Sequence, residues 1–257
     1  MPTTRLALAA VVGALVPLAS CADPSSPHPH TGMLKKYEAL PPIKMGLPKV
    51  DVDDAELRQG EPMLRHISLP GGWKRMVSFQ DVEAPEKVVW SAINDLPNYP
   101  KYVQGVVSCD VYSTEKGRSG EVVTCATYVL KAAGFAMTYY MQHNFYPKKH
   151  CMTFHLHYDR CSDLSDSVGY WYVEDLGDGW CRVYYSTDTK LPRFIPGFAK
   201  DMLTTLAAKR STGWVEKQCN QITGKSRGAG SGRRIPGRRQ LAAVLALAVG
   251  WWVRTNA

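Results

Sequence analysis

Apolar and polar residues alternate in seven segments between residues 72 and 222, and this alternation predicts β-strands. Residues typical of turns separate the segments. The expected strands span residues 73–82, 106–112, 121–130, 135–146, 151–158, 168–174 and 180–188. Short turns join most of these strands, whereas parallel pairing needs long crossovers. We therefore expect one antiparallel sheet of about seven strands.

Two stretches of the same region have helical periodicity. The first follows Ala84-Pro85, because proline is tolerated in the first turn of a helix and the carboxylate of Glu86 is favourable there. It ends at residues 95–100, and residues 101–104 add one further turn. Its apolar stripe consists of Val88, Val89, Ala92 and Ile93. The second is a long helix over residues 197–220, which follows two prolines.

The element order is strand, helix, short helix, six strands and long helix, which indicates an α+β fold. A single curved sheet must cover its inner face, and the long C-terminal helix is the element of matching length. A hollow between sheet and helix, lined by apolar and aromatic side chains, is the usual form of a small-molecule site.

The net charge of +8 changes this picture little, because of where the charge lies. All 23 acidic residues lie within residues 1–224, which carry a net charge of only +1. The excess basic residues belong to the C-terminal tail, where no aromatic residues are interleaved with residues 225–239. Stacking of bases on aromatic side chains is a main feature of single-stranded nucleic-acid binding, so we expect no nucleic-acid partner.

The N-terminus resembles a targeting segment. Arg5 precedes an uncharged apolar run over residues 6–19, and Ser20-Cys21-Ala22 offers the small residues that a signal peptidase needs. Residues 1–22 are therefore predicted to be a signal peptide or a signal anchor. The four residues 18–21 also fit a bacterial lipoprotein box. The expected location is the secretory pathway, with the protein secreted or membrane-associated, and the alternative is a plastid.

Two further segments flank the predicted domain. Residues 23–71 are rich in proline, which disfavours long helices and central strands, so we expect a linker there. Residues 223–257 combine a Gly-rich stretch, a basic spacer and an apolar run over 241–253. A helix of that length rises about 20 Å, short of a bilayer core of about 30 Å. The tail fits a GPI-attachment signal, a membrane-surface helix or a disordered tail.

Several segments of the domain resemble the START-like superfamily, most closely its polyketide cyclase and coenzyme Q-binding branch. Residues 84–95 resemble its first helix, residues 98–103 its second short helix, and residues 163–171 the turn into one of its strands. Residues 191–198 and 214–216 lie where the family enters and leaves its long helix. The resemblance implies a helix-grip fold over residues 72–222, in which the curved antiparallel sheet wraps around the C-terminal helix.

The resemblance also implies a cavity that binds, and in some members transfers, a hydrophobic molecule such as a lipid, sterol or quinone. Membrane association is expected through one terminus. The alternatives are a cyclase- or hydrolase-like enzyme that uses the same cavity and an interaction module without a cavity. A polar pair inside the pocket, such as His143 with a tyrosine, would favour the enzyme. By position on strands and helix, the candidate cavity residues are Tyr139, Met141, Phe154, Leu156, Tyr170, Tyr184, Phe198 and Met202.

Other candidate chemistry has simpler interpretations. His155 and His157 project from one strand face and could hold a metal with His143 or Cys151, but a polar outer face also explains them. The sequence contains none of the common hydrolase, metalloprotease or nucleotide-binding motifs. We therefore expect neither a metal nor a cofactor, and no catalytic residue is assigned. Six cysteines remain after residue 22 and fit either disulfides or buried thiols.

Overall fold

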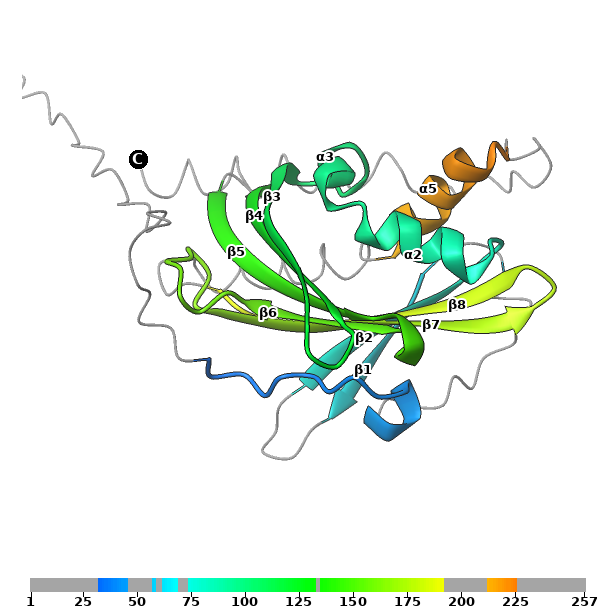
Figure 1. The fold of residues 1–257 in the computed structure, drawn as a ribbon, viewed down its shortest axis with the longest axis horizontal. Helices are drawn as coiled ribbons and strands as arrows, with labels where there is room; N and C mark the ends of the chain where they lie inside the picture. The colour runs from blue at the N-terminus through cyan, green and yellow to red at the C-terminus, as the bar shows by residue number, and fades with distance from the viewer. Residues whose placement is uncertain are drawn as a thin grey trace, which may run out of the picture. The chain divides into compact units, whose positions relative to one another are not determined.

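Eight strands form one antiparallel sheet in the computed structural model of the protein, which describes residues 32–45, 57–58, 62–68, 74–132, 135–191 and 212–225 (Figure 1). The order across the sheet is β1-β2-β8-β7-β6-β5-β4-β3. The strands are β1 Met63–Ser68, β2 Lys74–Val82, β3 Val106–Lys116, β4 Val122–Ala132, β5 Phe135–Tyr146, β6 Cys151–Leu156, β7 Asp166–Gly177 and β8 Trp180–Lys190. From β3 to β8 the chain pairs each strand with the next, which confirms the antiparallel prediction.

The helices lie on one side of the sheet, between β2 and β3 in the chain and after β8 (Figure 1). Helix α2, Glu86–Asn94, starts after Pro85 and buries Val89, Trp90, Ala92 and Ile93. The short elements η2, Leu96–Asn98, and α3, Tyr99–Tyr102, follow it, and the turn η3, Pro147–Lys149, joins β5 to β6. Helix α5, Gly213–Thr223, corresponds to the end of the predicted C-terminal helix. Residues 197–211 of that prediction lie outside the described residues.

Side chains of β2, β6, β7 and β8 are divided between two separate cores. In β8, Cys181, Val183 and Tyr185 face α2 and α5 in the inner core, whereas Tyr184 belongs to a second core on the outer face. The inner core also contains Trp171 of β7 and the buried face of α2. The fold is therefore the expected α+β helix-grip, with its main core between sheet and helices.

The outer core is covered by a segment that we call the N-terminal strap, residues 32–45, which ends in the turn η1, Pro42–Met45 (Figure 1). The carboxylate of Asp166 accepts hydrogen bonds from the backbone N–H groups of Met33 (2.5 Å) and Leu34 (2.7 Å). The ring of Tyr37 stacks on Tyr170, with centroids 5.6 Å apart. The stretch predicted as a linker therefore contributes both this strap and the additional strand β1 to the domain.

The contact pattern divides the chain into a unit of residues Met1–Thr223 and a unit of residues Gly224–Ala257. All strands and helices described above belong to the first unit. The predicted signal segment, residues 1–22, and most of the predicted tail lie outside the described residues. Among the helices that the structure describes, none is long and apolar enough to cross a membrane. The six described cysteines are buried and form no disulfide.

Candidate functional site

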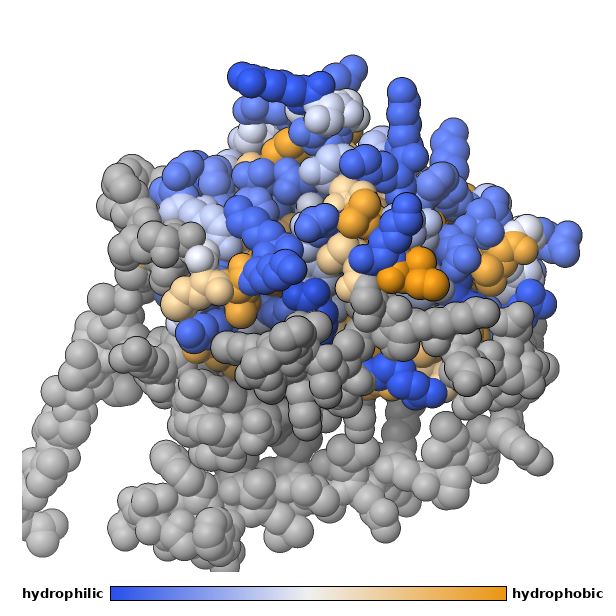
Figure 2. Space-filling view, turned by 90° about the horizontal axis from the view of Figure 1, so that it is seen from below, coloured by the Kyte–Doolittle hydropathy of each residue, from blue (hydrophilic) through white to orange (hydrophobic). Residues whose placement is uncertain are grey.

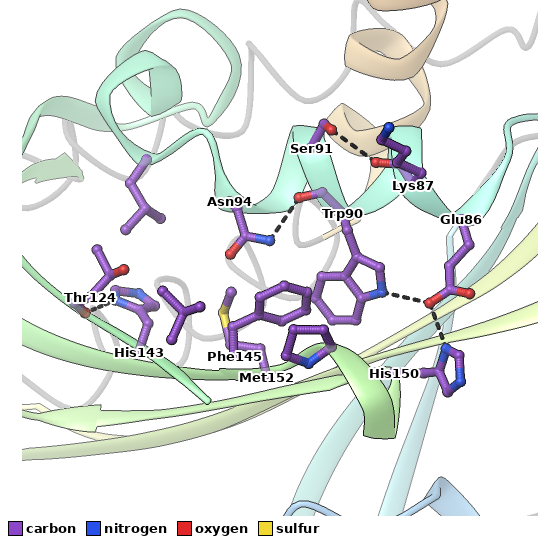
Figure 3. Close-up of a pocket in the computed structure, with 13 residues that line it drawn as sticks. Glu86, Lys87, Trp90, Ser91, Asn94, Thr124, His143, Phe145, His150 and Met152 are labelled. Atoms are coloured by element: carbon purple, nitrogen blue, oxygen red, sulfur yellow. Dashed lines mark hydrogen bonds and ion pairs between the residues drawn. The ribbon is translucent and has the colours of Figure 1, made fainter. Parts of the chain in front are cut away.

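A cleft of about 630 Å³ lies between α2 and strands β4, β5 and β6 (Figure 3). This volume is within the usual range for small-molecule sites. Helix α2 contributes Glu86, Lys87, Trp90, Ser91 and Asn94, the strands contribute Val122, Thr124, His143, Phe145 and Met152, and the connections contribute Leu96, Pro147 and His150. The strand residues belong together because Val122 pairs with Phe145, and Thr124 with His143, across the β4–β5 ladder.

The walls of the cleft are apolar and aromatic. The rings of Trp90 and Phe145 lie 4.6 Å apart between centroids, tilted by 45°. Met152 of β6 lies below them, toward the sheet (Figure 3). Trp90 is held in place at its polar end, because its indole N–H donates to the Glu86 carboxylate at 3.0 Å. Such flat apolar surfaces suit a hydrophobic molecule.

A buried polar pair lies beside these walls. The Tyr128 hydroxyl is 3.1 Å from Nε2 of His143, and Nδ1 of His143 is 3.2 Å from the Thr124 carbonyl oxygen. A carbonyl only accepts, so Nδ1 carries the proton and Nε2 accepts from Tyr128. Burial disfavours the charged imidazolium and lowers the pKa of His143 to about 4. Burial also raises the pKa of Tyr128 well above its ordinary value. Both groups are neutral at neutral pH.

At the opposite end of the cleft a histidine is hydrogen-bonded to a carboxylate. Nδ1 of His150 lies 2.6 Å from the same Glu86 oxygen that accepts from Trp90, which links α2 to the β5–β6 turn. His150 adopts a left-handed backbone conformation with φ of 52°, which is uncommon for a residue other than glycine. Figure 3 shows Asn94 above the strands, with its side-chain nitrogen donating to the Trp90 carbonyl at 2.9 Å. The side-chain oxygen of Asn94 is a hydrogen-bond acceptor in the lining of the cleft.

The predicted cavity residues separate into three groups. Tyr139, Met141, Phe154 and Leu156 lie at the inner core, although they do not line the described cleft. Tyr170 and Tyr184 lie in the outer core, under the strap. Phe198 and Met202 lie outside the described residues. The inner face of β7 and β8 instead carries Trp171 and Tyr185. Both faces of these strands are apolar, so alternation alone could not distinguish them.

None of the predicted cavity residues that the structure describes lines the cleft, and the large apolar residues that sequence reasoning missed there include Trp90, Phe145 and Met152. Phe145 shares the strand face of Met141 and His143, so its position on the inner face could be predicted from alternation. Trp90 lies on the buried face of α2, but a helical stripe does not reveal which of its members borders a cleft rather than the core.

The histidines considered as metal ligands do not converge. Gln142 pairs with His155 across the β5–β6 ladder, and His143 pairs with Phe154, so His143 and His155 lie on opposite faces of the sheet. His157 follows the face of His155 and lies within 2.6 Å of the Tyr112 hydroxyl. Over the described ranges, no group of three or more His, Cys, Asp or Glu residues has the arrangement of a metal site.

Comparison with known proteins gives a family and a set of related folds. The family described as polyketide cyclase / dehydrase and lipid transport matches residues 74–218, which is more than half of the chain. No curated protein matches the sequence.

Three solved structures illustrate the related folds. The STAR-related lipid transfer protein of Xanthomonas axonopodis is 11% identical with a TM-score of 0.50, and the match covers 65% of this chain and 96% of that protein. Human STARD10 is 8% identical with a TM-score of 0.50, and the match covers 64% of this chain and 71% of that protein. The Zhui aromatase/cyclase of Streptomyces sp. R1128 is 15% identical with a TM-score of 0.47, and the match covers 66% of this chain and 100% of that protein. At such identities the likeness concerns the fold alone.

Proposed function

Because the chain belongs to the polyketide cyclase / dehydrase and lipid transport family of the START-like superfamily, we propose that it binds a hydrophobic small molecule. A lipid, sterol or quinone is the class that fits, and the site is the cleft between α2 and strands β4–β6. This location differs from the hollow expected against the C-terminal helix, because α2 forms the described wall.

The observation that carries this proposal is the character of the cleft surface. Trp90, Phe145 and Met152 provide an apolar lining, and burying apolar ligand surface contributes roughly 25 cal/mol per Å². The Glu86 carboxylate at the cleft is already bonded by Trp90 and His150. Lys87 of α2 also lies at the border of the cleft. A ligand that is mainly neutral and apolar therefore matches the site better than an ion.

A second candidate is a cyclase- or hydrolase-like enzyme that uses the same cleft. The buried pair of Tyr128 and His143 favours it, because such a pair could exchange a proton with a bound molecule. General acid–base groups work best when their pKa lies near the working pH. Burial shifts the pKa values of Tyr128 and His143 away from neutrality in opposite directions, so this observation ranks binding above catalysis.

A substitution that obstructs the cleft tests the proposal. Val122 lines the cleft, whereas the adjacent residue Val123 projects from the other face of β4. We expect Val122→Trp to weaken the binding of fluorescent fatty-acid, sterol and quinone probes at least about tenfold, which corresponds to about 1.4 kcal/mol of lost binding free energy.

The matched control is Val123→Trp, which adds the same side chain outside the cleft and is expected to leave probe affinity unchanged. Far-UV circular dichroism verifies that both variants keep the fold. Equal binding by the wild type and Val122→Trp, or no binding of any probe class by the wild type, would contradict the proposal. Turnover of a bound compound that is lost in His143→Gln while binding persists would instead support the enzyme.

Delivery to the secretory pathway, or alternatively to a plastid, and membrane association through a terminus remain predictions from the sequence. The segments on which they depend, residues 1–22 and 226–257, lie outside the described residues.

A further inference from the structure

The outward side chains of the N-terminal strap form an unusual surface. Met33 is 60% exposed and Ile43 is 69% exposed, and they are two of the five large apolar side chains described as exposed. The exposed charged residues of the strap are Lys35, Lys36, Glu38 and Lys44. Lys190 adds a further cation, because its ammonium group lies 3.6 Å from the Met33 sulfur.

This surface is presented on a fixed backbone. Asp166 holds the start of the strap through two backbone N–H groups, and the Tyr37 hydroxyl lies 2.6 Å from Ser186 Oγ. The Tyr170 hydroxyl donates to the Leu40 carbonyl at 2.6 Å. Leu34, Ala39 and Met45 already pack inward against the outer core. Met33 and Ile43 therefore face outward in a segment that buries its other apolar side chains.

The cations of the strap are available to a partner. In the part of the chain that the structure describes, Lys35 and Lys44 form no ion pair, and the Lys36 ammonium lies 4.9 Å from the centre of the Tyr158 ring. The nearby carboxylate of Asp188 is paired with Arg75 at 2.8 Å, and Asp166 is fully buried. Figure 2 shows this side of the molecule, where small apolar patches lie among hydrophilic side chains.

We propose that the N-terminal strap docks on an anionic membrane surface, with Met33 and Ile43 inserted among the headgroups and the lysines against the lipid charge. Apolar side chains flanked by lysines are the composition of interfacial membrane-binding segments. The strap exposes no aromatic ring of the kind that anchors protein interfaces or stacks on bases, since Tyr37 is buried.

The strap and the cleft lie on opposite faces of the sheet. The strap lies on the outer face of the sheet (Figure 1), and the cleft lies on the inner face, between α2 and strands β4–β6. Docking through the strap therefore leaves the cleft open to water rather than against the bilayer. The affinity of the cleft for its ligand, after correction for ligand that partitions into the lipid, is expected to be the same with and without vesicles. The inference does not depend on the identity of the ligand, nor on the cleft being occupied.

Vesicle co-sedimentation of the full chain tests the proposal. The vesicles are phosphatidylcholine alone and phosphatidylcholine mixed with phosphatidylserine. Each lysine near an anionic surface contributes about fivefold to partitioning, so the triple variant Lys35→Gln, Lys36→Gln, Lys44→Gln is expected to bind the mixed vesicles about a hundredfold more weakly. The double variant Met33→Ser, Ile43→Ser is also expected to bind the mixed vesicles more weakly than the wild type. This loss should persist at high salt, where charge attraction is screened.

The matched control removes three exposed lysines that lie outside the strap, on α3, β4 and α5, in the variant Lys101→Gln, Lys131→Gln, Lys217→Gln. Its partitioning is expected to change far less. Hydrogen exchange measured on the wild type gives an independent readout, with slower exchange of residues 32–45 when mixed vesicles are present. Equal losses in the two lysine variants, or unchanged strap exchange in the presence of bound vesicles, would overturn the proposal. A strap variant that changes self-association but not vesicle partitioning would overturn it too, and would assign the face to a second copy of the chain.

Discussion

The imidazole of His143 is buried beside the cleft with both ring nitrogens in hydrogen bonds. Its two partners, Tyr128 and the Thr124 carbonyl, belong to the neighbouring strand β4, so the pair fixes the inner faces of β4 and β5 against each other. A buried polar group is costly when it loses its partners and favourable when each bond is made. The neutral state of His143 is therefore part of the folded structure.

The pH dependence of stability tests the state of His143. The unfolded chain binds a proton at this residue near pH 6.5, whereas burial lowers the folded pKa to about 4. The contribution of neutral His143 to the free energy of unfolding is then fully present above the unfolded pKa. It decreases as the pH falls, by about 2 kcal/mol from about pH 7.5 to about pH 5. Urea denaturation is expected to show a shallower decline in His143→Gln. The control His157→Gln removes a part-exposed histidine and should change the slope less, and equal slopes in His143→Gln and wild type would contradict the assignment.

The contact between Phe154 and Gly169 shows why single residues on the strands matter. The two residues are direct partners in the β6–β7 ladder. A Cβ atom at position 169 would lie 2.0 Å from the Phe154 ring, so the ring occupies the space that any larger residue would need. The sequence marks Gly169 as an unusual strand residue, but only the pairing of β6 with β7 reveals the ring above it.

Among the elements, the N-terminal strap depends on one buried carboxylate. Asp166 accepts from the backbone of Met33 and Leu34, from the Tyr158 hydroxyl at 2.9 Å and from its neighbour Ser167 at 2.8 Å. Hydrogen bonds to a charged acceptor are stronger than neutral ones, and several donors together replace the water that this carboxylate loses on burial. The strap stays on the outer face because of these bonds and the stacked ring of Tyr37.

Replacing this carboxylate is expected to loosen the strap. Asp166→Asn removes the charge and introduces an amide donor opposite existing donors, so the free energy of unfolding should fall by about 2 kcal/mol or more. Trypsin cleavage after Lys35 and Lys36 should become faster. The control Asp163→Asn changes a carboxylate that accepts from Thr138 on β5 and should not alter cleavage in the strap. Unchanged cleavage in Asp166→Asn would contradict the anchoring role.

The sequence predicted most elements but not the strap. Alternation and turn residues located β2 to β8 and α2, since each has an apolar face and a polar or breaking boundary. Residues 23–71 were interpreted as a linker, because prolines exclude regular elements there. An extended segment that contains prolines can still pack through its side chains, as the strap does through Tyr37. Proline also permits a short edge strand next to it, and β1 begins directly after Pro62.

At the scale of the whole domain, the hidden strap also explains the misplaced site residues. An ordinary antiparallel sheet has one face in water, so an aromatic residue indicates the inner face. Here the strap buries the outer face as well, and Tyr170 and Tyr184 are needed to pack against it. The inner face of β5 and β6 could be predicted from the sequence, because polar residues alternate there with Met141 and Phe154. The cleft itself depends on how α2 lies over β4 and β5, which no local pattern encodes.

The most direct test of the account is native mass spectrometry of the protein purified from the cells that produce it, with the wild type beside Val122→Trp and Val123→Trp. We expect the wild type and Val123→Trp to carry the same hydrophobic molecule, which organic solvent extracts, and Val122→Trp to carry much less of it, because its indole projects into the cleft. A molecule retained by Val122→Trp at the occupancy of the wild type would contradict a ligand site between α2 and strands β4–β6.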